Sequence, residues 1–169
     1  TVTIEDNIAP TMVCQDIVVQ LDAVGNAGII VANVDGGTND ACGIASLSID
    51  NNAFTCTNVG ANTVILTATD VNNNSATCTA NVTIIDQVAP TAVCQDITVQ
   101  LDATGNVTIA AADVDNGSSD ACGGAVTLAL TPSSSFDCDD LGANTVTLFV
   151  TDASGNSSFC TATVTVEDS

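Results

Sequence analysis

The sequence predicts an all-β protein of two tandem β-sandwich domains held together by disulfides. A repeat of about 80 residues is the first indication, because VTIEDNIAPTMVCQD at residues 2–16 returns as VTIIDQVAPTAVCQD at residues 82–96. The second is a series of short runs rich in Val and Thr, among which no apolar stripe of helical period exceeds one turn. The third is a set of eight cysteines, four in each repeat. Because domains of this size bury little core, we expect disulfides to staple them.

The repeat sets the predicted domain boundaries. Residues 1–8 correspond to the end of a preceding repeat or linker, residues 9–86 form the first domain, and residues 87–169 form the second domain and run into the next linker. A third copy of the motif begins at Val164, so both ends of the sequence share one phase of the repeat. We therefore expect the chain to be a segment of a longer tandem array.

The charge balance excludes several classes of partner. The chain contains twenty Asp and Glu residues and no Lys, Arg or His, which gives a net charge of −20. Attraction to nucleic acid phosphates or to an anionic membrane is excluded, and no apolar run is long enough for direct membrane insertion. A disordered acidic tail is also excluded, because 46% of the residues are hydrophobic. Carboxylates without cationic side chains attract solvent cations, and calcium is the first candidate.

Each repeat begins with a strand that has one buried face. Ile17, Val19 and Leu21 alternate with outward-facing positions, and the second repeat has the same pattern. Cys14 has the opposite parity from Ile17, which predicts a kink or bulge near Asp16. The first strand is therefore expected to be split into two short pieces.

The rest of each repeat reads as further strands joined by polar turns. A DAVGN or DATGN hairpin turn leads to predicted strands at residues 27–32 and 107–112. A loop rich in Asp and Asn and a third strand follow, GANTV then opens a fourth, and the closing strand alternates from Cys78 to Ile84. Six or seven short strands per repeat are typical of an immunoglobulin-like β-sandwich. The chain has no Trp or Tyr, so the conserved aromatic residues of antibody domains are missing.

The order of short motifs resembles the HYR, or hyalin repeat, domain. Both repeats contain Asp-x-x-Ala-Pro-Thr, Cys-x-Asp-Ile, a mid-repeat Phe-x-Cys, Gly-x-Asn-Thr-Val, Thr-Asp before a turn, and a Cys in the last strand. The acidic, cysteine-containing form is similar to tandem arrays in very large bacterial surface proteins. The resemblance implies an immunoglobulin-like fold and an extracellular role in adhesion or structure rather than catalysis. The first repeat departs from the second at one turn, where Asn72-Asn73-Asn74 stands in place of Ser154-Gly155-Asn156.

Four cysteines per repeat allow three pairings, and the spacing alone does not choose among them. The absence of His and of CxxC motifs argues against zinc or redox chemistry and favours structural disulfides in an extracellular, cell-surface setting. In an immunoglobulin-like order the first and last strands are parallel neighbours that both start where the chain arrives. That order predicts the bridges Cys14–Cys78 and Cys94–Cys160. The bridges Cys42–Cys56 and Cys122–Cys138 are then expected by elimination.

The same order gathers oxygen ligands at the end of each sandwich where the chain arrives. The candidate calcium ligands of the second repeat are Asp86, Asp113, Asp115, Asp120, Asp152 and Asn156. Their counterparts in the first repeat are Asp6, Asp35, Asp40, Asp70 and Asn74. Hard oxygen ligands from several segments suit calcium, which would stiffen the joint between repeats. The alternative is that these residues form Asx turns and keep the surface soluble.

Catalysis is not expected. The chain has no His, Lys, Arg or Tyr to act as a base, a proton donor or an oxyanion partner. Asp139 and Asp140 are adjacent, so in a strand their side chains point to opposite faces and cannot flank one bond.

The sequence therefore predicts a structural segment of an extracellular filament, or fibre, or of an adhesin stalk. Its partners would be other copies or repeats of itself, and residues 1–9 could add a strand to a neighbouring domain. The rival hypothesis is an adhesion module that binds a glycan or a surface protein through its loops. Against a glycan site stands the aromatic content, which is limited to four Phe.

Overall fold

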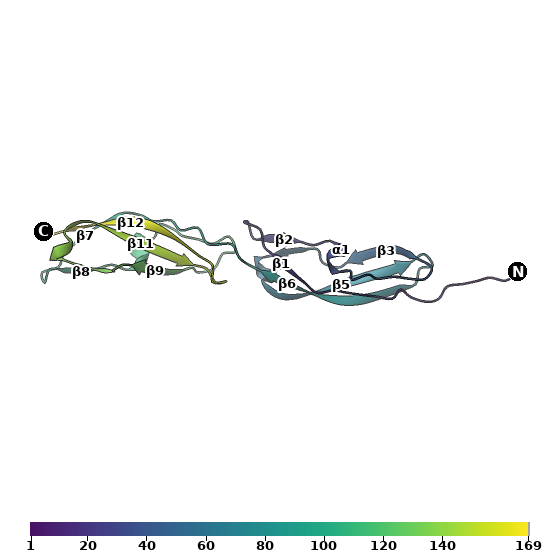
Figure 1. Ribbon diagram of the computed structural model, residues 1–169. Helices are drawn as coiled ribbons and strands as arrows, with labels where there is room; N and C mark the ends of the chain where they lie inside the picture. The colour runs from purple at the N-terminus through teal and green to yellow at the C-terminus, as the bar shows by residue number, and fades with distance from the viewer. Residues whose placement is uncertain (169) are drawn as a thin grey trace. The chain divides into compact units, whose positions relative to one another are not determined.

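The computed structural model describes residues 1–168 and divides into two compact units. The first unit is Thr1–Asp86, and the second begins at Gln87. Ser169, the last residue of the predicted second domain, lies outside the described residues. Each unit is a sandwich of a four-stranded and a two-stranded sheet, so the predicted all-β fold is confirmed (Figure 1). Among residues 1–168, no helix has the length and apolar character needed to cross a membrane.

The first unit contains six strands and two short helical turns among its described residues. They are β1 (Ile17–Gln20), β2 (Asn26–Gly28), α1 (Val31–Val34), β3 (Ile44–Ile49), β4 (Ala53–Thr55), the 3₁₀ turn η1 (Cys56–Asn58), β5 (Gly60–Asp70) and β6 (Ser75–Ile85). The larger sheet has the order β1-β6-β5-β3, and β2 pairs with β4 in the smaller one.

The second unit repeats this plan. Its elements are β7 (Ile97–Gln100), β8 (Asn106–Thr108), α2 (Ala111–Val114), β9 (Thr127–Thr131), β10 (Ser135–Asp137), the 3₁₀ turn η2 (Cys138–Asp140), β11 (Gly142–Thr151) and β12 (Ser157–Glu167). The sheet orders are β7-β12-β11-β9 and β8-β10, which match those of the first unit strand for strand.

Alternating side chains on the long central strands build both cores, as the sequence predicts. The buried hydrophobic residues of the first unit are Leu21, Ile29, Val34, Phe54, Val64, Leu66, Ala68, Ala80, Val82 and Ile84. Those of the second unit are Leu101, Ile109, Val114, Phe136, Val146, Leu148, Val150, Ala162, Val164 and Val166. Each core consists mainly of small aliphatic side chains and contains one buried Phe. A core of this size leaves room for disulfides to contribute much of the stability.

The first and last strands of each unit run parallel, and a disulfide joins the last strand to the segment just before the first. β1 pairs with β6 from Ile17↔Val82 onward, and the Cys14–Cys78 bridge lies before that pairing begins. The second unit has the equivalent pairing of β7 with β12 and the Cys94–Cys160 bridge. Both bridges form as the immunoglobulin-like order predicts. We call the end of a unit where its first strand begins the N-terminal pole, and the opposite end the C-terminal pole.

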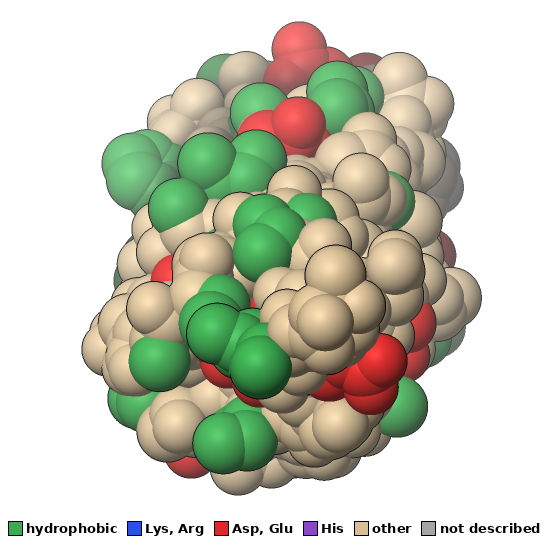
Figure 2. All heavy atoms as spheres, turned by 90° about the vertical axis from the view of Figure 1, so that its right-hand side faces the viewer, with side chains coloured by type: hydrophobic (Ala, Val, Ile, Leu, Met, Phe, Trp, Pro, Cys, Tyr) green, Lys and Arg blue, Asp and Glu red, His purple; other side chains and the backbone are tan. Residues whose placement is uncertain are grey.

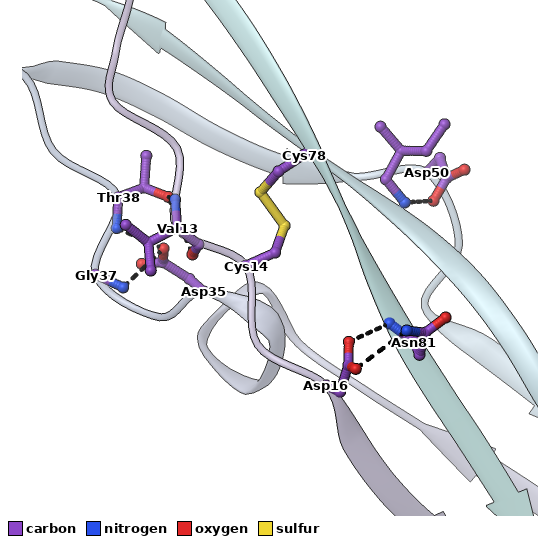
Figure 3. Close-up of a disulfide and its surroundings, with 10 residues drawn as sticks. Val13, Cys14, Asp16, Asp35, Gly37, Thr38, Asp50, Cys78 and Asn81 are labelled. Atoms are coloured by element: carbon purple, nitrogen blue, oxygen red, sulfur yellow. Dashed lines mark hydrogen bonds between the residues drawn. A yellow bond between two sulfur atoms is a disulfide. The ribbon is translucent and has the colours of Figure 1, made fainter.

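The predicted kink between Cys14 and Ile17 is present. Cys14 makes an isolated antiparallel bridge with Asp35. β1 starts three residues later, at Ile17, and pairs with a different segment, the strand β6. Asp16 holds the crossing point, because its carboxylate accepts hydrogen bonds from the backbone N and the side-chain Nδ2 of Asn81 at 2.7 and 3.0 Å (Figure 3). The disulfide and this double hydrogen bond therefore fasten the first segment of the chain to the last strand at two adjacent points.

The strands predicted at residues 27–32 and 107–112 are wrong in their second half. β2 and β8 are three residues long and cover only the first two positions of each predicted strand, and the chain then makes the helical turn α1 or α2. In α1 the Asn33 side chain accepts the backbone N–H of Ile30, and Asp113 does the same for Ala110 in α2. This local side-chain bond satisfies a free N–H at the start of the turn and favours helix over strand.

The turns between the long strands agree despite their different sequences. Asn73 has a φ of 72°, and Gly155 has a φ of 90° at the matching position. Asn is the residue that tolerates left-handed backbone best after Gly, so Asn73 replaces a glycine without changing the hairpin.

Because the Cys14–Cys78 bridge closes a long loop, we expect its removal to lower the stability of the first unit strongly, and the substitution of a free cysteine to have no effect. Replacing both Cys14 and Cys78 with Ser should lower the free energy of unfolding of the first unit by about 2–5 kcal/mol, because the unfolded chain gains the freedom of a long loop. Replacing Cys42 with Ser is the matched control and should leave that energy unchanged, since Cys42 is a free, exposed thiol. Chemical denaturation of the three proteins would measure the difference, and equal stabilities would show that the bridge is dispensable.

Candidate functional site

The N-terminal pole of the first unit brings together acidic side chains from three separate segments. Asp6 comes from the extended N-terminal segment, Asp40 from the loop before β3, and Asp70 from the end of β5. Asn74 links two of them, because its Nδ2 donates to the backbone oxygen of Asp6 at 3.0 Å and to Asp70 Oδ2 at 2.8 Å. Residues far apart in the sequence therefore meet where the chain arrives.

A tight cluster lies at the centre of this pole. One carboxylate oxygen each from Asp6 and Asp40 and the Sγ of Cys42 lie within 4.8 Å of one another. They line a cavity of about 330 Å³ together with Ile8, Ala9, Thr11, Asn39 and Ala41. Two converging carboxylates in an accessible cavity can hold a divalent cation. The thiol is a soft ligand, which calcium does not favour, so the oxygens of Asp6 and Asp40 are the groups that fit it.

The carboxylates raise the pKa of the Cys42 thiol. The largest cause is a hydrogen bond from Cys42 to the Asp6 side chain, followed by the charges of Asp6, Asp40 and Asp70. Sequence reasoning treated Cys42 only as half of a disulfide and missed its place among the acidic residues. Its position two residues after Asp40 was the available signal.

Asp70 closes the β5–β6 turn. The carboxylate accepts the backbone N–H groups of Asn72 and Asn74, both at 2.8 Å. Burial raises the pKa of Asp70, but the hydrogen bonds from the Asn74 side chain and from the turn backbone outweigh it, so the pKa is lowered overall. Because both oxygens of Asp70 already accept hydrogen bonds, this residue supports the cluster rather than offering a vacant ligand.

Asp35 does not join the cluster, contrary to the prediction. It bridges to Cys14, and its Oδ1 accepts the N–H groups of Gly37 and Thr38 (Figure 3). The Thr38 hydrogen bonds lower its pKa. This is the Asx-turn role that the sequence analysis left open as the alternative.

The second unit divides its predicted ligands in the same way. Asp113 caps α2, and Asp115 accepts hydrogen bonds from Gly117 and Ser118 as Asp35 does. Asp152 matches Asp70, because it accepts the N–H groups of Ser154 and Asn156 and the Nδ2 of Asn156. Asp113 and Asp115 are therefore turn-forming residues and not members of an acidic cluster.

Asp120 is the exception in the second unit. Its Oδ2 accepts the backbone N–H of Cys122 at 2.7 Å, whereas its Oδ1 is buried and has no hydrogen-bond partner among the described residues. An unpartnered buried carboxylate oxygen is costly and is a natural position for a cation. Asp86, the last residue of the first unit, is also buried.

The predicted bridges Cys42–Cys56 and Cys122–Cys138 are wrong, because Cys42 and Cys138 are free thiols. Cys42 lies at the N-terminal pole just before β3, whose Ile44 faces Asp70. Cys56 lies at the C-terminal pole, with its Sγ 3.5 Å from the Gly25 oxygen in the hairpin turn. β3 alone spans roughly 20 Å, far beyond the Cα separation of about 4.4–6.8 Å that a disulfide permits.

The charged side chains of the protein are all acidic, with no cationic side chains to compensate them. Figure 2 shows small groups of acidic side chains among hydrophobic and uncharged polar ones, with no Lys, Arg or His. The carboxylates are stabilised instead by backbone N–H groups in turns, as at Asp22, Asp40 and Asp102. Any further neutralisation must come from solvent cations.

The fold is similar to that of solved protocadherin fragments. The two-domain fragment EC1-2 of human protocadherin-24 matches with a TM-score of 0.51 and 10% identity, over 96% of this chain and 100% of that one. Human mucin-like protocadherin EC1-2 has a TM-score of 0.45 and 14% identity, over 95% and 98% of the two chains. Mouse clustered PcdhgC3 EC1-3 has a TM-score of 0.44 and 14% identity, over 95% and 68%. The match to protocadherin-24 EC1-2 agrees with an immunoglobulin-like β-sandwich fold and says nothing of function.

The chain spans only 51% and 33% of two longer protocadherin fragments that it also matches. No family model and no curated protein matches the sequence.

The double hydrogen bond of Asp16 predicts a specific pH dependence. The Asn81 side chain and backbone lower the pKa of Asp16, so its contribution to stability is present above the ordinary Asp pKa of about 3.9 and is lost as the pH falls through the lower folded value. Asp16→Asn should therefore destabilise the first unit at neutral pH, and the gap from wild type should close in acid. Urea unfolding at a series of pH values measures this gap, with Asp139→Asn as a charge-matched control. A gap that does not change with pH would contradict the assignment.

Proposed function

We propose that the chain is a structural segment of an extracellular filament or adhesin stalk, built from tandem repeats of the hyalin-repeat kind. One observation carries the proposal: in each unit the first and last strands are parallel neighbours, and a disulfide ties the segment just before the first strand to the last strand. The chain therefore arrives at one pole and leaves at the other. Repeats with this geometry can be joined end to end.

The same geometry suits a module under tension. In the reduced protein, pulling the two ends of a unit apart would shear the parallel β1–β6 ladder, so its hydrogen bonds would be loaded together and not one by one. In the oxidised protein the Cys14–Cys78 bridge carries the load directly from the first segment to β6. It bypasses the intervening chain, β1 included, because the bridged cysteines are 64 positions apart in the sequence. In this account most of each sandwich is protected from the force that the array transmits.

Calcium at the N-terminal pole would stiffen the connection between a repeat and the segment that leads into it. Asp6 belongs to the segment that leads into the first unit, and Asp40 belongs to the sandwich itself, so one ion bound by both ties the linker to the domain. The unpartnered Oδ1 of Asp120 supports a similar role in the second unit. With few protein ligands and the remainder water, the affinity would be in the weak extracellular range, with a Kd of about 10⁻⁴ to 10⁻³ M.

A binding role is the second candidate, and one observation favours it. Phe149 and Phe159 lie side by side on the outer face of β11 and β12, with ring centroids 5.8 Å apart. They are 42% and 65% exposed, which is unusual for aromatic side chains in so small a domain. An exposed aromatic pair is a surface on which a sugar ring or an apolar side chain of a surface protein can stack.

Calcium should stabilise the wild-type protein and lose this effect when either cluster carboxylate is removed. At ten times the Kd the gain is about 1.4 kcal/mol for one site. Asp6→Asn and Asp40→Asn should each abolish the calcium-dependent rise in melting temperature of the first unit. Asp139→Asn, which removes the same charge elsewhere, should retain it. A wild-type melting temperature that is the same with calcium and with chelator would rule out the site.

Electron microscopy distinguishes the two functions. The structural role predicts thin fibres with an axial repeat of roughly 40 Å, since an 11-residue strand such as β6 spans about 36 Å. The binding role predicts a monodisperse protein that binds a glycan array and loses that binding when Phe149 and Phe159 are both replaced with Ala. Fibres that form equally well without residues 1–9 would exclude strand addition by that segment as the means of assembly.

A further inference from the structure

Each unit has one free thiol. The free thiol of the first unit lies at its N-terminal pole, and that of the second unit lies at its C-terminal pole. Cys42 is exposed at the N-terminal pole of the first unit, where its backbone N–H is held by Asp40. Cys138 is exposed at the C-terminal pole of the second unit, at the start of η2. Its Sγ lies 3.7 Å from the backbone oxygen of Gly105, which forms the hairpin turn at that pole. Each thiol is thus held in place at the end of a sandwich, beside a tight turn.

The equivalent cysteines are oxidised. Cys122 occupies the position of Cys42 in the second repeat, and Cys56 occupies the position of Cys138 in the first. Both Cys56 and Cys122 are disulfide-bonded. A cysteine at the N-terminal pole and a cysteine at the C-terminal pole can therefore each form a disulfide. The length of the sandwich prevents Cys42 from reaching Cys56, and Cys138 from reaching Cys122, within one repeat.

We propose that Cys138 of one chain and Cys42 of a second copy form a disulfide that joins the chains end to end. The inference rests on the proposed filament function and assigns the groups that make its covalent joints. The contact is heterologous, because it joins a C-terminal pole to an N-terminal pole and leaves one thiol available at each end. Contacts of this kind extend into open filaments and do not stop at a dimer.

The local chemistry sets the conditions for this reaction. Asp137 and Asp139 flank Cys138 in the sequence, and the carboxylates of Asp6 and Asp40 lie near the Cys42 thiol, so the two poles repel each other at low salt. Salt shortens the range of this repulsion to about 8 Å at physiological ionic strength. The coupling is therefore expected only in salt and not in dilute buffer.

Oxidised glutathione is a sufficient oxidant for the coupling. The Cys138 thiolate attacks its disulfide, forms a mixed disulfide and releases one glutathione thiolate. The Cys42 thiolate of the second chain then attacks the Cys138 sulfur and releases the second glutathione. In total two protein thiols lose two protons and two electrons, and these convert one oxidised glutathione into two reduced molecules.

A mixing experiment tests the proposal. Cys42→Ser and Cys138→Ser proteins, one of them labelled with a heavy isotope, are incubated with oxidised glutathione in physiological salt, separately and together. We expect each variant alone to stay monomeric and the mixture to give a mixed dimer whose mass contains one copy of each. Peptide mapping should find the Cys42 and Cys138 peptides joined. Wild-type protein should give a ladder of oligomers, and the double variant should lose that ladder completely.

Two results would overturn the proposal. Homodimers that form as readily as mixed dimers would show unspecific thiol oxidation, and a mixture that stays monomeric while its melting curve matches wild type would show that the poles do not meet. Cys42→Ala and Cys138→Ala repeat the test if a serine variant folds poorly. If the double variant still forms fibres, the proposed cross-link is rejected while the proposed structural function is retained. The failure of one proposal can therefore be told from the failure of the other.

Discussion

The parallel contact between the first and last strands of each repeat determines where every other feature lies. Because β1 and β6 start at the same pole, the chain must arrive at one end of the sandwich and leave at the other. The Cys14–Cys78 bridge and the Asp16–Asn81 hydrogen bonds fasten that contact near its start. The acidic cluster, the turns and the remaining cysteines then fall at one pole or the other as a consequence of strand direction.

An acidic chain without cationic side chains must stabilise its carboxylates by other means. Asp35, Asp70 and Asp115 accept side-chain and backbone hydrogen bonds within turns, and these hydrogen bonds lower the pKa of each carboxyl group. The carboxylates that converge on each other at Asp6 and Asp40 are a different class, since they share a cavity. This distinction separates residues that shape the repeat from residues that a cation can bridge.

Much of the fold could be predicted from the sequence because period-two alternation and a repeated motif are local signals. The buried residues of the long strands and the kink before Ile17 follow from them, and the bridge from Cys14 to Cys78 follows from the immunoglobulin-like strand order. The helical turns could not be predicted in this way, since they depend on one side chain, that of Asn33 or Asp113, bonding to a backbone N–H three residues earlier. The pairing of Cys42 with Cys56 was wrong because it was chosen only as the pair left over after Cys14 and Cys78. The path of the strands shows that Cys42 and Cys56 lie at opposite poles, too far apart for a disulfide.

The most direct test of the account is single-molecule extension of the oxidised and reduced chain, pulled from its two ends. In the oxidised protein the bridges should keep 64 positions of the first repeat and 66 of the second out of the force path. Reduction should therefore add about 220 Å of extension for each repeat that unfolds, at about 3.5 Å per residue. Equal extensions before and after reduction would show that force does not pass through these bridges, and would contradict the mechanical role proposed for the repeat.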